Sequence, residues 1–570
     1  MSVNLLQVSS AGFAYICLGG FVVAFSTVSL LIKEKLYINE VILGTIFGIL
    51  VGPHCANIFD PRGWGSSSNA ITLEVMRVIL ATGLFAIGVE LPGSYMAKHV
   101  RGLLVLVVPT MAFGWVVVAA IMHGLFPDLV YVSCLAIAAC LTPTDPIICA
   151  TIVGGSSQQL LPSSGSRMLY LGGKYALKHV PKNLRLLISA ESAANDGLAY
   201  PFLSISIYLT VEASRRVAIG KWFLVGWLYQ VILGTVLGAV LGMAFSYVMK
   251  VSHRRGFIDR ESFVAQYLAL ALFTIGVAST LGTDDLLAAF ACGNAISWDQ
   301  HFNEVTEKEV FSSVIDLVLN CGCFVYIGAW MPFDSFNDPA LGITLWRLVV
   351  LFIAILALRR IPSVVLLYRW VPEITTWREA LFTGHFGPMG VGAVFVSTLA
   401  LTRLPTPHDP PETQQELLAA TIQPIVAFVV LGSIIIHGLS IPFFSLSGNM
   451  HSLVATLTRT DTADWLLSIR RGPAVMPTPD VERAPGESRT ATVVTAPELE
   501  VQIHERDQTA PGKEMEQVRD APSAAGIELG VGRKRVISSE RSVLEEALEE
   551  AEPRMPPAVL GGQESIPGAQ

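Results

Sequence analysis

Two carboxylates lie close together in one apolar stretch of the sequence. Residues 189–197 read Ser-Ala-Glu-Ser-Ala-Ala-Asn-Asp-Gly. If this stretch is helical, Glu191 and Asn195 share one stripe of its surface, because residues four apart are neighbours on a helix. Ser192 and Asp196 share the next stripe, and the small residues around them let another helix approach closely. No basic residue stands beside the two acids, so they need protons or cations. This pattern favours an ion site over a polar patch that only packs helices.

A second polar group interrupts the preceding apolar stretch. Residues 141–146 read Leu-Thr-Pro-Thr-Asp-Pro. Each proline removes a backbone donor and clashes with the turn before it, so a helix must break here. Inside a membrane such a break is tolerated only where its backbone groups face protein or line a cavity. Thr144 and Asp145 at this break therefore predict an ion site at mid-depth.

The residue types at these two places indicate which ion. Oxygen ligands from one Asp together with Thr, Ser and Asn suit a hard monovalent cation, because divalent ions usually take more negative charge. A proton and a cation would compete for the carboxylate of Asp196. If the site faces the two sides of a membrane in turn, this competition produces exchange of cations for protons.

Arg359 and Arg360 stand late in another apolar stretch and have two interpretations. Both lie at the cytoplasmic end of a helix, or one of them reaches inward and neutralises a buried acid. Glu191 is the natural candidate for that acid, because an uncompensated buried carboxylate would otherwise take up a proton.

A glycine-rich segment interrupts a further stretch. Residues 384–392 read Gly-His-Phe-Gly-Pro-Met-Gly-Val-Gly, and four glycines with a proline weaken a helix at its centre. Interrupted helices at matching positions of two inverted halves are typical of a transporter's midplane site. His385 in this segment is either a titrating group or a structural histidine.

The composition shows what must position these residues. The chain has 570 residues, of which 52% are hydrophobic and 15% charged, whereas soluble domains carry about 25% charged residues. A soluble globular protein, a nucleic-acid binder and a disulfide scaffold are therefore excluded. A membrane-spanning helix needs roughly 20 apolar residues, and thirteen stretches qualify or nearly qualify. They cover about 11–32, 39–56, 72–91, 102–126, 129–153, 185–210, 222–249, 262–281, 285–297, 309–331, 341–368, 379–402 and 417–445.

These stretches predict an all-α membrane protein of about 13 transmembrane helices. The ninth is too short for a full span, so the count is good to about one. Stretches one to six and eight to thirteen would form two inverted six-helix repeats, with the interrupted fifth paired with the interrupted twelfth. The first stretch lacks the basic start and the cleavage site of a signal peptide, so we expect it to be retained.

Charge divides the chain into a membrane domain, 1–450, and a tail, 451–570. The tail holds 33 charged residues in 120 positions and the domain 51 in 450. Few aromatics and much Pro, Glu and Ser predict a mostly disordered acidic tail. Within the domain, sixteen basic residues fall in loops on the side of loop 33–38 and five on the other side. The positive-inside rule therefore places the N-terminus outside and the tail in the cytoplasm.

These motifs resemble the monovalent cation:proton antiporter family, the sodium/proton exchangers of the CPA1 type. Residues 191–196 look like the family's ESxxND helix, and residues 144–146 look like its unwound TDP segment. Residues 282–285, 291–299 and 324–329 are similar to the fungal plasma-membrane sodium (potassium)/proton antiporters in particular. The similarity covers roughly residues 10–445.

By position, the resemblance implies an ion- and proton-binding site. Its residues would be Asp196, Asn195, Asp145, Thr144 and Ser192, with Na+ or K+ held by Asp196, Thr144, Asp145 and Ser192. Glu191 would form a structural ion pair with Arg360, whose spacing to Val364 fits better than that of Arg359. One departure is Pro388-Met389, where animal exchangers carry a basic residue, so no charge role transfers there.

The resemblance also implies the cargo, the partners and the location. The protein would exchange Na+, Li+ or K+ for H+, would need no cofactor and would not be an enzyme. It would be a homodimer in the lipid bilayer of the plasma membrane, with no nucleic-acid partner and a tail that binds regulatory proteins. The serious alternative is a proton-coupled solute symporter. No HExxH or GxGD-type segment supports a membrane protease.

Overall fold

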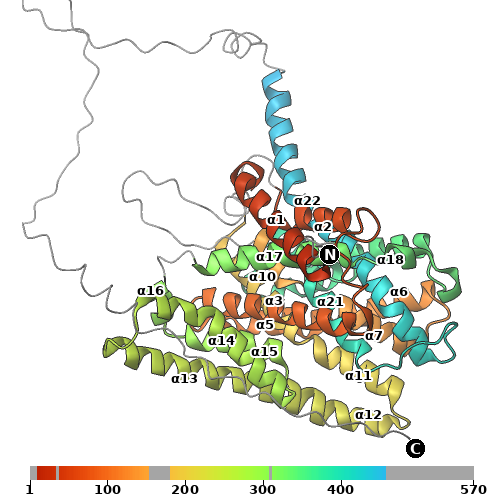
Figure 1. Ribbon diagram of the computed structural model, residues 1–570, viewed down its shortest axis with the longest axis horizontal. Coiled ribbons are helices and arrows are strands. Elements are labelled where there is room, and N and C mark those ends of the chain that lie inside the picture. The colour runs from red at the N-terminus through yellow and green to blue at the C-terminus, as the bar shows by residue number, and fades with distance from the viewer. Residues whose placement is uncertain (1–8, 34–37, 153–179, 307–310, 458–570) are drawn as a thin grey trace, which may run out of the picture. The chain divides into compact units, whose positions relative to one another are not determined.

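Helices make up nearly all regular structure in the described part of the chain (Figure 1). The computed structural model describes residues 9–33, 38–152, 180–306 and 311–457, all of them within one compact unit, Met1–Pro473. Over these residues the β-structure consists of a single bridge between Asp338 and Ile343. The all-α prediction is therefore confirmed. Residues 451–457 of the expected tail belong to the last helix, and the rest of the tail lies outside the described residues.

The principal helices follow one another along the chain in this order: α1 (Ser10–Leu31), α2 (Glu40–Val51), α3 (Ser68–Glu90), α4 (Tyr95–Lys98), α5 (Val100–Val107), α6 (Pro109–Leu125), α7 (Tyr131–Leu141), α8 (Pro146–Ile152), α10 (Lys182–Gly197), α11 (Ala199–Val211), α12 (Arg215–Lys221), the π-helical η3 (Trp222–Leu233), α13 (Gly234–Arg254), α14 (Arg260–Leu281), α15 (Asp285–Ile296), α16 (His301–Thr306), α17 (Phe311–Trp330), α18 (Leu345–Leu358), α19 (Ile361–Leu367), α20 (Trp377–His385), α21 (Val391–Leu401) and α22 (Gln414–Leu457). Short 3-10 turns occupy Gly65–Ser67, Phe333–Asn337, Pro339–Leu341 and Tyr368–Trp370.

Nine helical runs in the described residues are long and apolar enough to cross a membrane. Three more apolar helices are shorter, namely Glu40–Val51, Asp285–Ile296 and Val391–Leu401. The last two agree with the sequence, which predicts a short ninth stretch and an interrupted twelfth. The number thirteen is not established by these helices.

Both expected interruptions are present. The fifth stretch is broken between Leu141, where α7 ends, and Pro146, where α8 begins. The twelfth is broken between His385, where α20 ends, and Val391, where α21 begins. Pro143 stands in the first gap, and Gly387, Pro388 and Gly390 stand in the second, so each helix ends where the sequence contains residues that weaken helices.

A third interruption separates α18 from α19 at Arg359 and Arg360. Pro362 stands in the first turn of α19, a position where its missing N–H costs nothing. Arg359 and Arg360 are only 4% and 5% exposed. Both side chains therefore point into the protein, as the second interpretation of this pair requires of one of them.

Glycines allow several helices to pack with their backbones almost in contact. A Cβ atom built at Gly328 of α17 would overlap the Thr45 carbonyl oxygen of α2, and one built at Gly48 of α2 would overlap the Val325 carbonyl oxygen of α17. A Cβ at Gly88 of α3 would lie 2.7 Å from the Phe290 carbonyl oxygen of α15. Close approach through small residues is the usual basis of helix association in membranes.

Gly328→Ala should therefore destabilise the protein, whereas Gly322→Ala on the same helix should not. The first methyl group meets backbone that cannot move away, and such overpacking costs about 1–3 kcal/mol. The second meets nothing within 4 Å, and alanine is the better helix former. Thermal unfolding of the purified protein in detergent measures both. Equal melting temperatures for the two variants would contradict this account of the α2–α17 contact.

Candidate functional site

The interruptions of the fifth and twelfth stretches meet in space. The backbone N–H of Asp145 donates to the carbonyl oxygen of Pro388 at 2.7 Å. Thr144 and Asp145 are 1% and 2% exposed, so this crossing point is buried. Two unwound segments far apart in the sequence thus satisfy each other's backbone groups, as an interruption within a membrane requires.

Asp145 caps two helices with one carboxylate. Its Oδ1 accepts from the N–H of Ile148 in the first turn of α8, at 2.8 Å. Its Oδ2 accepts from the N–H groups of Val391 and Gly392, in the first turn of α21. Both helix N-termini carry partial positive charge and free N–H groups, which a carboxylate satisfies. The Asp145 oxygens are therefore fully engaged with backbone.

Arg359 satisfies the opposite ends of the same interruptions. Its Nη1 donates to the carbonyl oxygens of Leu141 (2.6 Å), Pro143 (3.3 Å) and Thr142 (3.4 Å) at the end of α7. Its Nη2 donates to the Gly387 carbonyl oxygen, between α20 and α21. A helix C-terminus leaves carbonyl groups without partners, and a guanidinium has five N–H donors for them.

Arg360 forms a two-pronged ion pair with Glu191. Its Nη1 and Nη2 lie 2.7 and 2.8 Å from the Glu191 oxygens Oε1 and Oε2. Its Nε donates to the Thr383 carbonyl oxygen of α20 at 3.1 Å. Glu191 has no exposed surface, and this geometry is the favourable one for a buried arginine and carboxylate. Of the two arginines, it is Arg360 that the structure pairs with Glu191.

Asn195 connects this ion pair to the interruption of the fifth stretch. Its Nδ2 donates to Glu191 Oε1 at 2.6 Å and to Thr144 Oγ1 at 2.8 Å. Its Oδ1 accepts from the Thr144 N–H at 3.0 Å. The amide side chain therefore fixes the unwound segment against α10, and none of its main donor and acceptor directions is left unused.

Asp196 differs from the other acids of the site. It is 1% exposed, and neither of its carboxylate oxygens has a hydrogen-bond partner among the described residues. A Cβ atom built at Gly392 of α21 would overlap its Oδ1, so the glycine leaves room for the carboxylate. Asp196 lies within electrostatic range of Asp145 and Asp284. A buried carboxylate without partners is costly unless it binds a proton or a cation.

Ser192 is buried, and its hydroxyl donates to the Ser189 carbonyl oxygen of its own helix at 3.0 Å. No described contact joins it to Asp196. The sequence-predicted residues are thus close neighbours on α10 and at the two crossing interruptions. Only Asp196 presents oxygens that are unused by the protein.

Two charged groups outside the predicted site are also buried at its edge. Asp284, 7% exposed, accepts from the N–H of Leu287 and caps α15. The neighbouring Asp285 forms an ion pair with Arg77 of α3 at 2.7 Å. The Arg77 side chain is only 16% exposed and faces α15. The two adjacent acids at 284–285 are visible in the sequence, but nothing in it pairs them with Arg77.

His385 lies beside a second histidine that the sequence analysis does not single out. Its Nε2 is 3.3 Å from the Ser440 hydroxyl of α22, and its ring stacks on His437 with centroids 5.3 Å apart. His437 Nε2 in turn contacts the His385 carbonyl oxygen at 3.0 Å. These contacts are those of a structural histidine that joins α20 to α22.

A family model and two similar relatives share one description, that of sodium/proton exchangers or antiporters. The family model described as sodium/hydrogen exchanger, transmembrane, matches residues 21–446. The probable Na(+)/H(+) antiporter C3A11.09 of Schizosaccharomyces pombe is 42% identical over 480 residues, which are 83% of this chain and 61% of that protein. The Na(+)/H(+) antiporter of Saccharomyces cerevisiae is 41% identical over 80% of this chain and 45% of its own length. The chain thus spans about half to three fifths of these two relatives.

A third relative and a solved structure extend the comparison. A Na(+)/H(+) antiporter of Schizosaccharomyces pombe is 35% identical over 80% of this chain and 95% of its own length. The sodium proton antiporter MjNhaP1 from Methanocaldococcus jannaschii superposes with a TM-score of 0.54 at 16% identity, over 76% of this chain and 99% of that structure. The chain therefore shares the fold of MjNhaP1.

Replacing Arg360 by Ala should destabilise the protein strongly, because it leaves Glu191 buried without a partner. Breaking a buried ion pair in this way costs about 3–5 kcal/mol. The matched control is Arg369→Ala, at an exposed position of the same segment. The double variant Glu191→Leu/Arg360→Met should recover much of the loss, since it removes both charges. Thermal unfolding in detergent decides, and a single variant as stable as the control would contradict the structural role of the pair.

Proposed function

This chain belongs to the sodium/hydrogen exchanger family, and from that premise we propose that it exchanges monovalent alkali cations for protons across a membrane. The cargo would be Na+, Li+ or K+. The observation that carries the proposal is the state of Asp196, a buried carboxylate whose two oxygens have no protein partner among the described residues. Glu191 and Asp145, by contrast, are fully engaged.

In the proposed mechanism Asp196 binds either a proton or a cation, and never both. The cation ligands would be oxygens of Asp196, Thr144, Asp145 and Ser192, with Asn195 beside them. Asp196 is the principal ligand, because the Asp145 oxygens already accept backbone N–H bonds. The site would open to each side of the membrane in turn, so that loading one ion requires release of the other. Competition at one carboxylate suffices for exchange and needs no cofactor and no chemical reaction.

We further propose a homodimer in the plasma membrane, with the N-terminus outside and the tail in the cytoplasm, where it binds regulatory proteins. The distribution of basic residues supports this orientation. The symporter alternative finds no support in the comparisons, since the relatives are named antiporters.

Asp196→Asn should abolish exchange without unfolding the protein. The amide cannot alternate between a proton and a cation, yet the substitution breaks no hydrogen bond in the structure. The assay is a proteoliposome with an imposed proton gradient and an internal pH dye, to which Na+, Li+ or K+ is added. Dissipation of the gradient by the variant should fall to the level of protein-free liposomes.

Glu74→Gln is the matched control, because this carboxylate on α3 is 60% exposed and its variant should keep normal exchange. An Asp196→Asn protein that still dissipates the gradient on addition of Na+ would overturn the assignment. Uptake of a solute driven by the proton gradient, with no response to alkali cations, would favour the symporter instead.

A further inference from the structure

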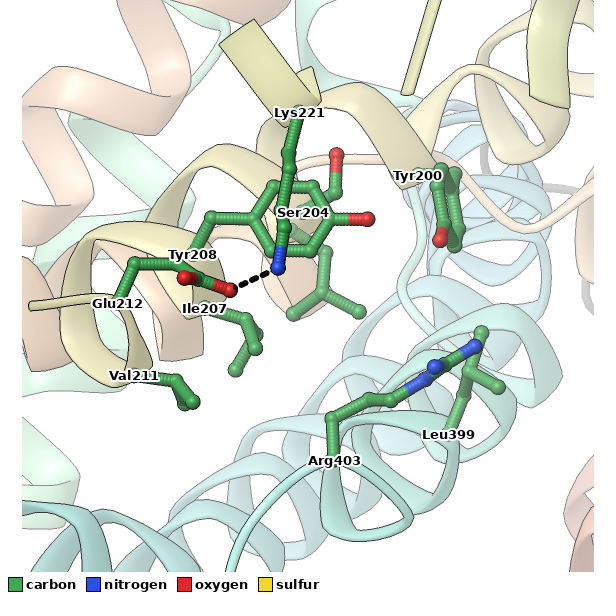
Figure 2. Close-up of a pocket in the computed structure, with 10 residues that line it drawn as sticks. Tyr200, Ser204, Ile207, Tyr208, Val211, Glu212, Lys221, Leu399 and Arg403 are labelled. Atoms are coloured by element: carbon green, nitrogen blue, oxygen red, sulfur yellow. Dashed lines mark hydrogen bonds and ion pairs between the residues drawn. The ribbon is translucent and has the colours of Figure 1, made fainter. Parts of the chain in front are cut away.

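A cavity of about 220 Å³ lies beside α11, outside the site just described. It is bounded by α11, by the end of α12 and by the end of α21 (Figure 2). Its lining includes Tyr200, Ser204 and Tyr208 of α11 and Glu212 directly after that helix, at intervals of four residues. At 1.5 Å per residue these positions span about 18 Å along the helix. The cavity is therefore elongated along α11.

The cavity and Asp196 share the neighbouring helix α21: Gly392 packs against the Asp196 carboxylate, and Leu399, seven residues later on α21, lines the cavity. Tyr200 stands four residues after Asp196, one turn further along the chain, where α10 gives way to α11 at Leu198. The Tyr200 hydroxyl lies within electrostatic range of Asp284, as does Asp196 itself. The cavity therefore begins one turn after Asp196 along the chain, and its polar lining on α11 leads away from that carboxylate toward Glu212.

The outer end of the cavity carries more positive than negative charge. Glu212 Oε1 and Lys221 Nζ form an ion pair at 2.5 Å, which joins the end of α11 to the end of α12. On the facing wall, Arg403 follows α21, and no described ion pair neutralises its guanidinium. Figure 2 shows the Arg403 side chain extended along the cavity, opposite the Glu212–Lys221 pair. The lining therefore holds two cations and one carboxylate, a net charge of +1.

We propose that Lys221 and Arg403 form an electropositive mouth that lowers the affinity of Asp196 for cations arriving from this side. This inference rests on the proposed exchange function, and in the proposed orientation the mouth faces outward. A positive field at the entrance lowers the local cation concentration and speeds departure of a released cation. Glu212 opposes this effect by neutralising Lys221. The equilibrium of exchange does not change, because the ion gradients set it. The half-saturating cation concentration changes, and only on the side of the cavity.

The first test measures half-saturating Na+ separately on each side of proteoliposomes that contain the full chain in one known orientation. In Lys221→Gln/Arg403→Gln the value on the cavity side should fall about two- to tenfold at low ionic strength. The half-saturating Na+ concentration on the cavity side should rise in Glu212→Gln, which frees the charge of Lys221. It should stay near normal in Arg403→Lys, which keeps the positive charge. The value on the other side should not move. At about 0.5 M choline chloride the differences should shrink, because salt screens exposed charges.

Arg369→Gln is the control, since loop 369–378 lies on the opposite side in the proposed topology. Equal shifts on both sides, or a shift that salt does not screen, would overturn the proposal and indicate a general structural effect. Unchanged half-saturation in the double variant would overturn it as well.

A second measurement does not depend on transport. Val211 lines the cavity and is 43% exposed, so Val211→Cys can be labelled with an anionic and a cationic thiosulfonate of similar size. The electropositive mouth predicts faster labelling by the anionic reagent, with the ratio reduced about two- to tenfold when Lys221 and Arg403 are both Gln. If the ratio of anionic to cationic labelling rates is the same in both proteins, the proposed electropositive mouth is rejected. If the ratio of labelling rates changes but the protein shows no cation–proton exchange, the electropositive mouth is supported and the proposed function is rejected.

Discussion

Unwound backbone buried at membrane depth is the constraint on which the rest of this structure depends. Every carbonyl and N–H group at an interruption needs a partner from the protein, because lipid offers none. Asp145 supplies acceptors for the N-termini of α8 and α21, and Arg359 supplies donors for the end of α7 and for Gly387. The two interruptions are stable only together, since each side chain serves both. The crossing therefore places α10, with its acids, against the first turn of α21.

The three buried acids of this site differ in their contacts. Glu191 balances Arg360 and, through Asn195, holds Thr144 in place. The carboxylate of Asp145 accepts hydrogen bonds from the N-terminal N–H groups of α8 and α21. The carboxylate that remains, Asp196, faces a glycine where any larger residue would displace it. In the proposed mechanism, Asp196 binds the ion while Glu191, Asn195 and Asp145 hold the surrounding backbone, so these three residues can stay fixed when Asp196 changes its partner.

The sequence predicts the elements of this site better than the contacts between them. Prolines, glycines and intramembrane acids are local signals, so the interruptions and the stripe of Glu191 to Asp196 are visible without a structure. Arg359 shows the limit, because its four carbonyl partners lie in two other stretches and depend on how three interruptions meet. The tight fit of Gly392 to Asp196 likewise depends on tertiary approach, for which the sequence offers only an unusual density of glycine. The ion pair of Arg77 with Asp285 is equally hidden in the sequence, because the two residues are more than two hundred positions apart.

Charge balance supports the proposal that a proton and a monovalent cation replace each other at Asp196. Apart from Asp284, which lies at the edge of the site and caps α15, five charged side chains are buried at the crossing: Arg359, Arg360, Glu191, Asp145 and Asp196. With all five ionised they carry two positive and three negative charges, a net charge of −1. Buried charge is tolerated when it is balanced, and one proton or one alkali cation on Asp196 brings the sum to zero. A divalent ion on Asp196 would bring the sum of these five side chains and the ion to +1. The nearby helix N-termini already interact with Asp145, so they offer no further negative charge to balance it. In the proposed mechanism these five residues therefore favour one positive charge on Asp196, whether a proton or an alkali cation carries it.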